Sequence, residues 1–183
     1  NTCFNVTYKC QTKLLIEALK GQYNRDMTFK DTIDLASSIS LDEYFGTIYP
    51  GYPVMKTKIT RKNQAENVRA AFDYYAGRKN KQAIAMLESF GILDGDKIRP
   101  EGSKYAAYYI DMLKKLQPQG VFNYADIFEP ANDNMFVDKE FKINYRFTPI
   151  VFLSLVYAGY AVITLKDGST LAASNLDKVP KIK

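Results

Sequence analysis

The fold is decided by residues 80–100, which read NKQAIAMLESFGILDGDKIRP. Asn80 is a favoured helix N-cap, and the apolar residues after it keep helical spacing as far as Phe90. Gly91 occupies the position of a left-handed residue that ends a helix. Asp94-Gly95 is the turn signal of a short hairpin. A helix, a glycine stop and a small hairpin are the ordered parts of a winged-helix unit, which this stretch therefore predicts.

The same pattern begins again at Thr148, about 70 residues further along the chain. Thr148 is expected to cap a helix with Pro149 at its first position, and Gly159 ends that helix. A strand pair with Asp167-Gly168 at its turn follows. The sequence therefore predicts a mainly α chain with small β-hairpins, an α+β fold that contains two tandem winged-helix-like units.

Three parts are expected along the chain. A helical N-terminal extension covers residues 1–53 and ends in a turn cluster, YPGYP, at 49–53. The first winged-helix-like unit covers residues 54–117, and the second covers residues 118–183. Because the sequence begins with Asn1 rather than Met, we expect it to be a piece of a longer polypeptide.

Hydrophobic periodicity predicts the remaining elements. Within the extension we expect a helix over residues 7–20 and one or two short helices over 28–45, with a break near Ser37-Ser38. Further helices are expected over residues 63–76, 103–116 and 121–128. Residues 129–138 are rich in Pro, Asn and Asp, which is typical of a surface loop.

Composition excludes several kinds of chemistry. The chain has 183 residues, of which 46% are hydrophobic and 25% charged, so it is able to form a core. It contains no His, which excludes His-dependent catalytic triads, His-ligated zinc sites and His proton shuttles. The two cysteines, Cys3 and Cys10, are too few for a four-cysteine zinc site or a disulfide scaffold. We expect free thiols in a reducing compartment, the cytoplasm.

One apolar run is long enough to consider as a membrane span. Residues 147–165 contain 19 consecutive residues without a charge. However, Thr, Pro, Ser and Gly residues dilute the run, and the residues after Gly159 have the β-branched and aromatic content of a strand. The sequence therefore favours a buried helix followed by a strand, and no membrane partner is expected.

Four stretches of the chain carry a resemblance to a known family. They are YPGYP at 49–53, AIAMLESFGILDG at 83–95, SKYA at 103–106 and the segment from LVYAGY to Asn175-Leu176 at 155–176. Together they resemble a non-ATPase region of the very large phage-defence P-loop ATPases of the phage growth limitation and bacteriophage exclusion (BREX) type. The resemblance covers Tyr44 to Val179 and implies an accessory region of such a protein. No GxxxxGK[ST] string occurs, so a nucleotide site would lie elsewhere in the parent.

Two acidic clusters invite a catalytic or metal-binding interpretation. Asp94 and Asp96, with Glu101 nearby, offer paired carboxylates, but a hairpin tip explains the first two more simply. The stretch Asn132-Asp133-Asn134 lacks the later Gly and Glu that an EF-hand requires and is typical of a surface turn. We expect no catalytic residue, no metal site and no cofactor, so the chain is interpreted as a non-enzymatic module.

Positive charge is concentrated in the middle of the chain. The formal net charge is +5, and residues 56–115 contain 13 Lys or Arg against 7 Asp or Glu. Such a segment attracts phosphates through counterion release, whereas the alternative is a solvated helical surface. The candidate nucleic-acid-binding residues are Arg78, Lys79, Lys81 and Lys104.

Two functions remain after these exclusions. The first is a non-catalytic protein-interaction or docking module of a larger phage-defence ATPase, with other regions of the parent polypeptide or separate proteins as partners. The alternative is a DNA-binding winged-helix module that uses the basic region 56–115 without sequence preference. Base-specific readout is not expected, because Gln82, Glu88 and Ser89 offer few bidentate donors on the helix that would enter the groove.

Overall fold

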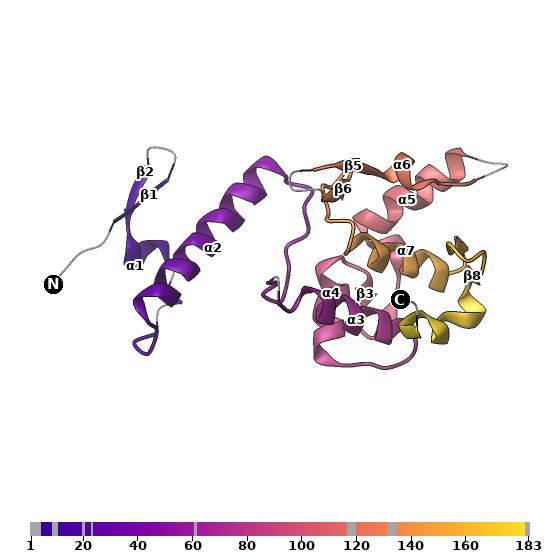
Figure 1. Cartoon of the computed structure of the whole chain (residues 1–183), viewed down its shortest axis with the longest axis horizontal. Helices are drawn as coiled ribbons and strands as arrows, with labels where there is room; N and C mark the ends of the chain where they lie inside the picture. Colours follow the sequence, from indigo (N-terminus) through magenta and orange to yellow (C-terminus); the bar gives the residue numbers. More distant parts are fainter. Residues whose placement is uncertain are drawn as a thin grey trace. The chain divides into compact units, whose positions relative to one another are not determined.

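The computed structural model describes residues 5–8, 11–19, 21–22, 24–60, 62–116, 120–131 and 135–181. The chain divides into unit 1, Asn1–Tyr52, and unit 2, Pro53–Lys183. Figure 1 shows the helices and the small hairpins of both. The strands of the described residues pair in antiparallel twos. The predicted α+β class, with small β-hairpins among helices, is therefore confirmed.

Unit 1 begins with a hairpin rather than a helix. Strands β1 (Asn5–Tyr8) and β2 (Gln11–Leu14) are antiparallel, and only the short α1 (Leu15–Ala18) is helical. The helix expected over residues 7–20 is therefore wrong for its first half. The first strand contains two β-branched residues and the second contains one, which favours extended backbone. The apolar residues that suggested a helix begin only at Leu14, the last residue of β2.

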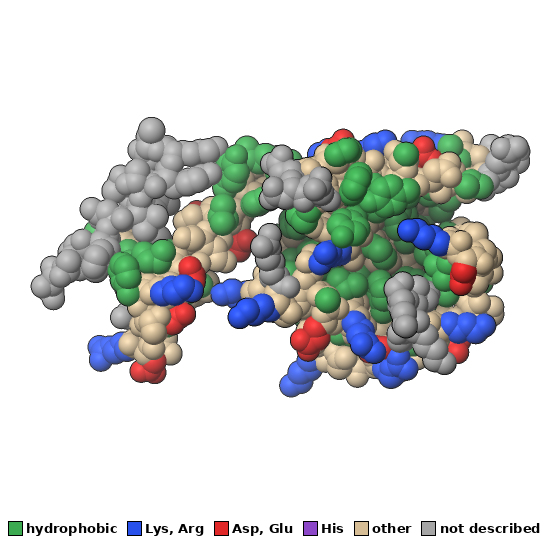
Figure 2. Space-filling model, viewed as in Figure 1, with side chains coloured by type: hydrophobic (Ala, Val, Ile, Leu, Met, Phe, Trp, Pro, Cys, Tyr) green, Lys and Arg blue, Asp and Glu red, His purple; other side chains and the backbone are tan. Residues whose placement is uncertain are grey.

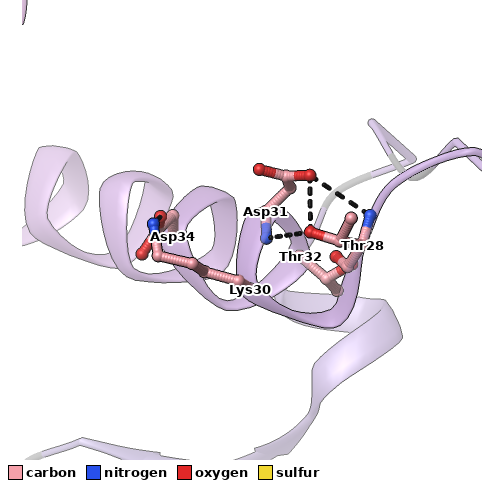
Figure 3. A network of polar contacts seen from close by, with 5 residues as sticks. All are labelled: Thr28, Lys30, Asp31, Thr32 and Asp34. Atoms are coloured by element: carbon pink, nitrogen blue, oxygen red, sulfur yellow. Dashed lines mark hydrogen bonds and ion pairs between the residues drawn. The ribbon is translucent and has the colours of Figure 1, made fainter.

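Helix α2 (Phe29–Ile48) is continuous through both central serines. The break predicted near Ser37-Ser38 is wrong, because serine lowers helix propensity only modestly and the strong helix formers Leu35 and Ala36 directly precede the pair. A capping box starts the helix: the Thr28 hydroxyl accepts from the Asp31 N–H at 3.2 Å, and the Asp31 carboxylate accepts from the Thr28 N–H at 3.2 Å (Figure 3). Within the same first turns, Lys30 and Asp34 form an exposed ion pair at 3.2 Å (Figure 3).

The first part of unit 2 agrees closely with the sequence pattern. It contains α3 (Gln64–Tyr75), α4 (Lys81–Ser89), β3 (Leu93–Asp94), β4 (Lys97–Ile98), the 3-10 helix η1 (Pro100–Gly102) and α5 (Lys104–Lys115). The Asn80 side chain accepts from the Ala83 N–H at 2.8 Å, so the predicted cap is confirmed. Gly91 has a φ of 62°, which confirms the left-handed stop. Strands β3 and β4 pair around Gly95 as predicted.

The second part of unit 2 contains α6 (Tyr124–Ile127), β5 (Phe128–Pro130), β6 (Phe136–Asp138), α7 (Thr148–Tyr157), β7 (Ile163–Thr164), β8 (Thr170–Leu171) and the 3-10 helix η3 (Ala173–Lys181). Helix α7 ends before Gly159, and β7 and β8 form the predicted second hairpin around Asp167-Gly168. No described helix is both long and apolar enough to cross a bilayer.

This second part differs from the prediction in several details. The helix expected over residues 121–128 is shorter, since α6 begins at Tyr124 and Phe128 already belongs to β5. The loop expected over residues 129–138 is wrong at its ends, where β5 and β6 pair with Phe128 opposite Asp138 and Pro130 opposite Phe136. The Asn and Asp content that suggested a loop belongs to the stretch between the strands. The N-cap of α7 is Phe147, so Thr148 is the first helical residue instead of the cap.

A single hydrophobic cluster forms the core of unit 2 and draws on α3, α4, α5 and α7. Phe90, Met86 and Leu87 are fully buried, as is Ile150 on α7. The Tyr75 hydroxyl of α3 donates to the Ile150 carbonyl at 2.7 Å, which joins the two parts through a buried hydrogen bond. Unit 1 has its own small cluster of Leu15, Leu19 and Ala36. The division of unit 2 at residues 117 and 118 stays a prediction.

Candidate functional site

Three of the candidate nucleic-acid-binding residues lie together in the segment between α3 and the first turn of α4. Arg78 forms an ion pair with Asp73 at 2.5 Å. The ammonium of Lys79 lies 5.3 Å from the centroid of the Tyr74 ring and donates to the Asp96 carbonyl at 3.3 Å. This segment therefore lies against the tip of the first hairpin, because Asp96 belongs to the turn between β3 and β4.

The fourth candidate, Lys104, lies at the other end of α4. It follows Ser103, whose hydroxyl donates to the Phe90 carbonyl at the end of α4 at 2.6 Å. Helix α4 has nine residues, so its two ends are about 13 Å apart. The Lys104 ammonium lies 5.0 Å from the centroid of the Tyr105 ring. Arg78, Lys79 and Lys81 are therefore neighbours in one short segment. Lys104 lies apart from them, at the other end of α4.

Several other cations of the basic region have acidic partners. The ion pairs are Lys56–Glu88 at 3.0 Å, Arg99–Asp94 at 2.9 Å and Lys114–Asp111 at 3.6 Å. Figure 2 shows Lys and Arg side chains interspersed with Asp and Glu on the visible face of unit 2. These acidic partners lower the positive potential near Lys56, Arg99 and Lys114, so these three cations add little to any positive field of residues 56–115.

Two of the three carboxylates considered for catalysis have partners within the protein. Asp94 pairs with Arg99, whereas Asp96 is linked to its surroundings through its main-chain carbonyl, which accepts from the Tyr74 hydroxyl at 3.1 Å and from the Lys79 ammonium at 3.3 Å. Glu101 accepts from the Tyr160 hydroxyl at 2.6 Å, which lowers the pKa of Glu101 and raises the pKa of Tyr160. Among the described residues no group of three or more His, Cys, Asp or Glu is placed to hold a metal ion. Cys3, Cys10 and Asn132-Asp133-Asn134 lie outside the described residues.

Sequence reasoning missed one buried carboxylate. Asp138 is fully buried and accepts from the Phe141 N–H at 2.8 Å and the Ile143 N–H at 2.6 Å. The Tyr109 hydroxyl is a further hydrogen-bond partner. Burial raises the pKa of Asp138, although these N–H groups favour the ionised form. Its oxygens are satisfied by the protein itself, so Asp138 orders the turn after β6, where Lys142 adopts a φ of 58°.

Sequence reasoning also missed an exposed apolar surface at the end of α7, which we call the α7 exit surface. It consists of Tyr157, Tyr160 and Val162, all exposed. The Tyr157 ring lies 6.3 Å from the ring of buried Tyr75, and the hydrogen bond to Glu101 fixes the Tyr160 hydroxyl. No sequence signal marks these residues, because a tyrosine in a helix is as compatible with a core as with a surface.

A model of a known protein family matches most of unit 2. Residues 64–183 match the model described as "Family of unknown function (DUF6079) 4th domain". The chain belongs to this family. The DUF6079 match begins at the first residue of α3 and contains all the helices and hairpins of unit 2, whereas unit 1 lies outside it. Neither the curated proteins nor the solved structures that were searched contain a match.

Proposed function

We propose that this DUF6079 domain is a non-catalytic docking module of a larger protein. The observation that carries the proposal is the α7 exit surface, where two tyrosines and Val162 are exposed although the preceding residues of α7 belong to the buried core. Tyrosine supplies large contact area at low entropic cost and is enriched in protein interfaces. The hydrogen bond between Tyr160 and Glu101 reduces that cost further, since it orders the tyrosine before a partner arrives.

The proposed partner is another domain of the same parent polypeptide. The description "4th domain" supports a parent with several domains, to which this module would contribute a surface instead of an active site. The four stretches that resemble the phage growth limitation and BREX-type ATPases support placing the parent in that class. ATP hydrolysis would then reside in a different domain. Each of two units consists of a helix, a glycine and a hairpin with an Asp-Gly turn. This repetition supports a tandem winged-helix-like arrangement, a fold that serves docking as well as DNA binding.

Changing the α7 exit surface should weaken this docking. The double variant Tyr160→Ala with Val162→Ala is expected to lower affinity for the remaining domains of the parent, produced as a separate chain, by about tenfold or more, because truncating interface aromatics has effects of this size. Isothermal titration calorimetry measures the change. The matched control is Val54→Ala, since Val54 is even more exposed but lies elsewhere in unit 2. Equal affinities for the double variant and the control would refute this use of the surface.

DNA binding remains the second candidate, and one observation favours it. Arg78, Lys79 and Lys81 lie within four residues beside a hairpin tip, which is the position of a wing in winged-helix proteins. The ion pair to Asp73 and the nearby Asp94 and Asp96 weaken the attraction for phosphate. These carboxylates do not weaken docking through apolar contacts. Docking is therefore the preferred proposal.

A further inference from the structure

The second hairpin of unit 2 has a protected edge along β8. On this outer side, the Asn175 side chain accepts from the Ala172 N–H at 2.8 Å and donates to the Thr170 carbonyl at 2.9 Å. Asn175 belongs to η3, which lies next to β8 (Figure 1). Its side chain therefore occupies main-chain groups that β8 would otherwise offer to a further strand.

The outer edge of β7 has no such cover. Leu165 and Ser169 form the hydrogen-bonded pair next to the turn, since the Leu165 N–H donates to the Ser169 carbonyl at 2.8 Å. Because hydrogen-bonded and non-hydrogen-bonded pairs alternate in an antiparallel hairpin, the N–H and C=O groups of Val162 and Thr164 point away from β8. Within the described part of the chain, these groups have no hydrogen-bond partner. They are open to a further strand.

The side chains along this open edge alternate between the core and solvent. Ala161, Ile163 and Leu165 are partly buried against the core of unit 2. Val162 and Thr164 between them are exposed, Val162 by 61%. This alternation is typical of a strand with one buried face. Natural proteins protect exposed strand edges with charged residues or proline, but this stretch contains neither.

The first hairpin of the same unit is built differently. Its strands carry charged residues, Asp94 in β3 and Lys97 in β4, and Arg99 forms an ion pair with Asp94. Its turn is held in place, because the Asp96 carbonyl accepts from the Tyr74 hydroxyl at 3.1 Å. The uncharged edge of the second hairpin is therefore not a consequence of the helix, glycine and hairpin pattern that both parts share.

We propose that another domain of the parent polypeptide adds an extended segment to β7 as a third, hydrogen-bonded strand. This inference rests on the proposed docking function and specifies how the partner binds. Strand addition uses the unpaired main-chain groups for affinity, while side chains that alternate along the edge give specificity. The added segment carries apolar residues next to Val162. The contact is continuous with the α7 exit surface, to which Val162 and Tyr160 already belong.

A covalently linked domain fits this edge better than a second copy of the chain. Val162 and Thr164 offer two N–H and two C=O groups, and so few hydrogen bonds hold separate copies together only weakly. Domains of one polypeptide meet at an effective concentration in the millimolar range, at which a weak contact is occupied. A dimer formed edge to edge through β7 is the alternative that the experiment below distinguishes.

Two variants at one position separate main-chain pairing from side-chain contact. Thr164→Pro removes the outward N–H, and the fold should tolerate it because that N–H takes no part in the pairing of β7 with β8. Thr164→Ala is the matched control, since it changes the side chain but retains the N–H. Thr164→Pro should lower the affinity for the remaining domains of the parent, produced as a separate chain, about tenfold in isothermal titration calorimetry. Thr164→Ala should bind like the wild type.

Hydrogen exchange on the wild-type chain gives a second readout that needs no variant. The Val162 and Thr164 amides should exchange about tenfold more slowly or less when the remaining domains are bound, because their N–H groups then donate to the added strand. Unchanged exchange at these amides in the complex overturns the inference, whatever Thr164→Pro does.

The outcomes also separate this inference from the docking function on which it rests. If Tyr160→Ala with Val162→Ala weakens docking but Thr164→Pro does not, strand addition is overturned and docking through the α7 exit surface stands. If the wild-type chain does not bind the remaining domains, both fail. If the chain dimerises by itself and Thr164→Pro abolishes the dimer, the added strand is that of a second copy, which also overturns the inference.

Discussion

Replacing Phe90 with Ala is expected to lower the unfolding free energy of unit 2 by about 3–5 kcal/mol. Phe90 is fully buried at the end of α4, and its ring centroid lies 5.7 Å from that of Tyr105. Truncation removes these contacts and leaves a cavity that the neighbouring helices fill only in part. Domains of this size are stable by about 5–15 kcal/mol, so a large share of the total is lost.

The same variant tests whether unit 2 has one core. If α4 and α7 share it, Phe90→Ala should reduce hydrogen-exchange protection in α7 as well as in α4, because both open in the same unfolding event. Denaturant titration measures the loss in unfolding free energy. Hydrogen-exchange rates show which helices have lost protection. Val162→Ala, at an exposed position, should change stability by less than about 0.5 kcal/mol. Full protection of the α7 amides in Phe90→Ala would show that the two parts unfold separately.

Asp138→Ala should have the second largest effect, about 2–4 kcal/mol of unfolding free energy. The change leaves the buried N–H groups of Phe141 and Ile143 without their acceptor, and each such loss is costly. Removal of a buried charge offsets part of this cost. Asp138→Asn retains one acceptor oxygen and should be milder. Equal stability of wild type and Asp138→Ala in urea titrations would show that this carboxylate does not hold the turn.

The carboxylate of Asp138 also gives stability a pH dependence of known sign. Burial raises its pKa above the unfolded value, so the folded state binds the proton more tightly. Its contribution is therefore fully present below the unfolded pKa, about 3.9, and is lost as the pH rises through the folded pKa. The stability of wild type relative to Asp138→Asn should fall across this range. A difference that rises with pH would mean that the N–H groups outweigh burial.

Local signals explain where sequence reasoning succeeded. The Asn80 cap and the left-handed Gly91 depend on residues within one turn of a helix, and the Asp-Gly turns fix their hairpins through backbone conformation alone. These features could be predicted from short stretches. The β1–β2 and β5–β6 hairpins were missed because strand pairing depends on a partner segment that short-range patterns do not specify.

The candidate site was harder to predict because its contacts join distant residues. Lys56 and Glu88 are 32 positions apart, and Tyr160 and Glu101 are 59 apart, so no spacing rule connects them. A count of charges along the sequence gives the excess of residues 56–115 but not the ion pairs that distribute it. Exposure of the α7 exit surface likewise depends on which side of α7 the core occupies.

A salt titration with duplex DNA tests most directly whether this module docks on protein rather than on nucleic acid. We expect no measurable binding at low ionic strength, because acidic partners accompany the basic residues beside the first hairpin. Binding that weakens steeply with salt would contradict the account. The contradiction would be complete if replacing Arg78, Lys79 and Lys81 with Ala flattened the salt slope by about one unit per lost contact, while replacing Lys114 and Lys115 did not.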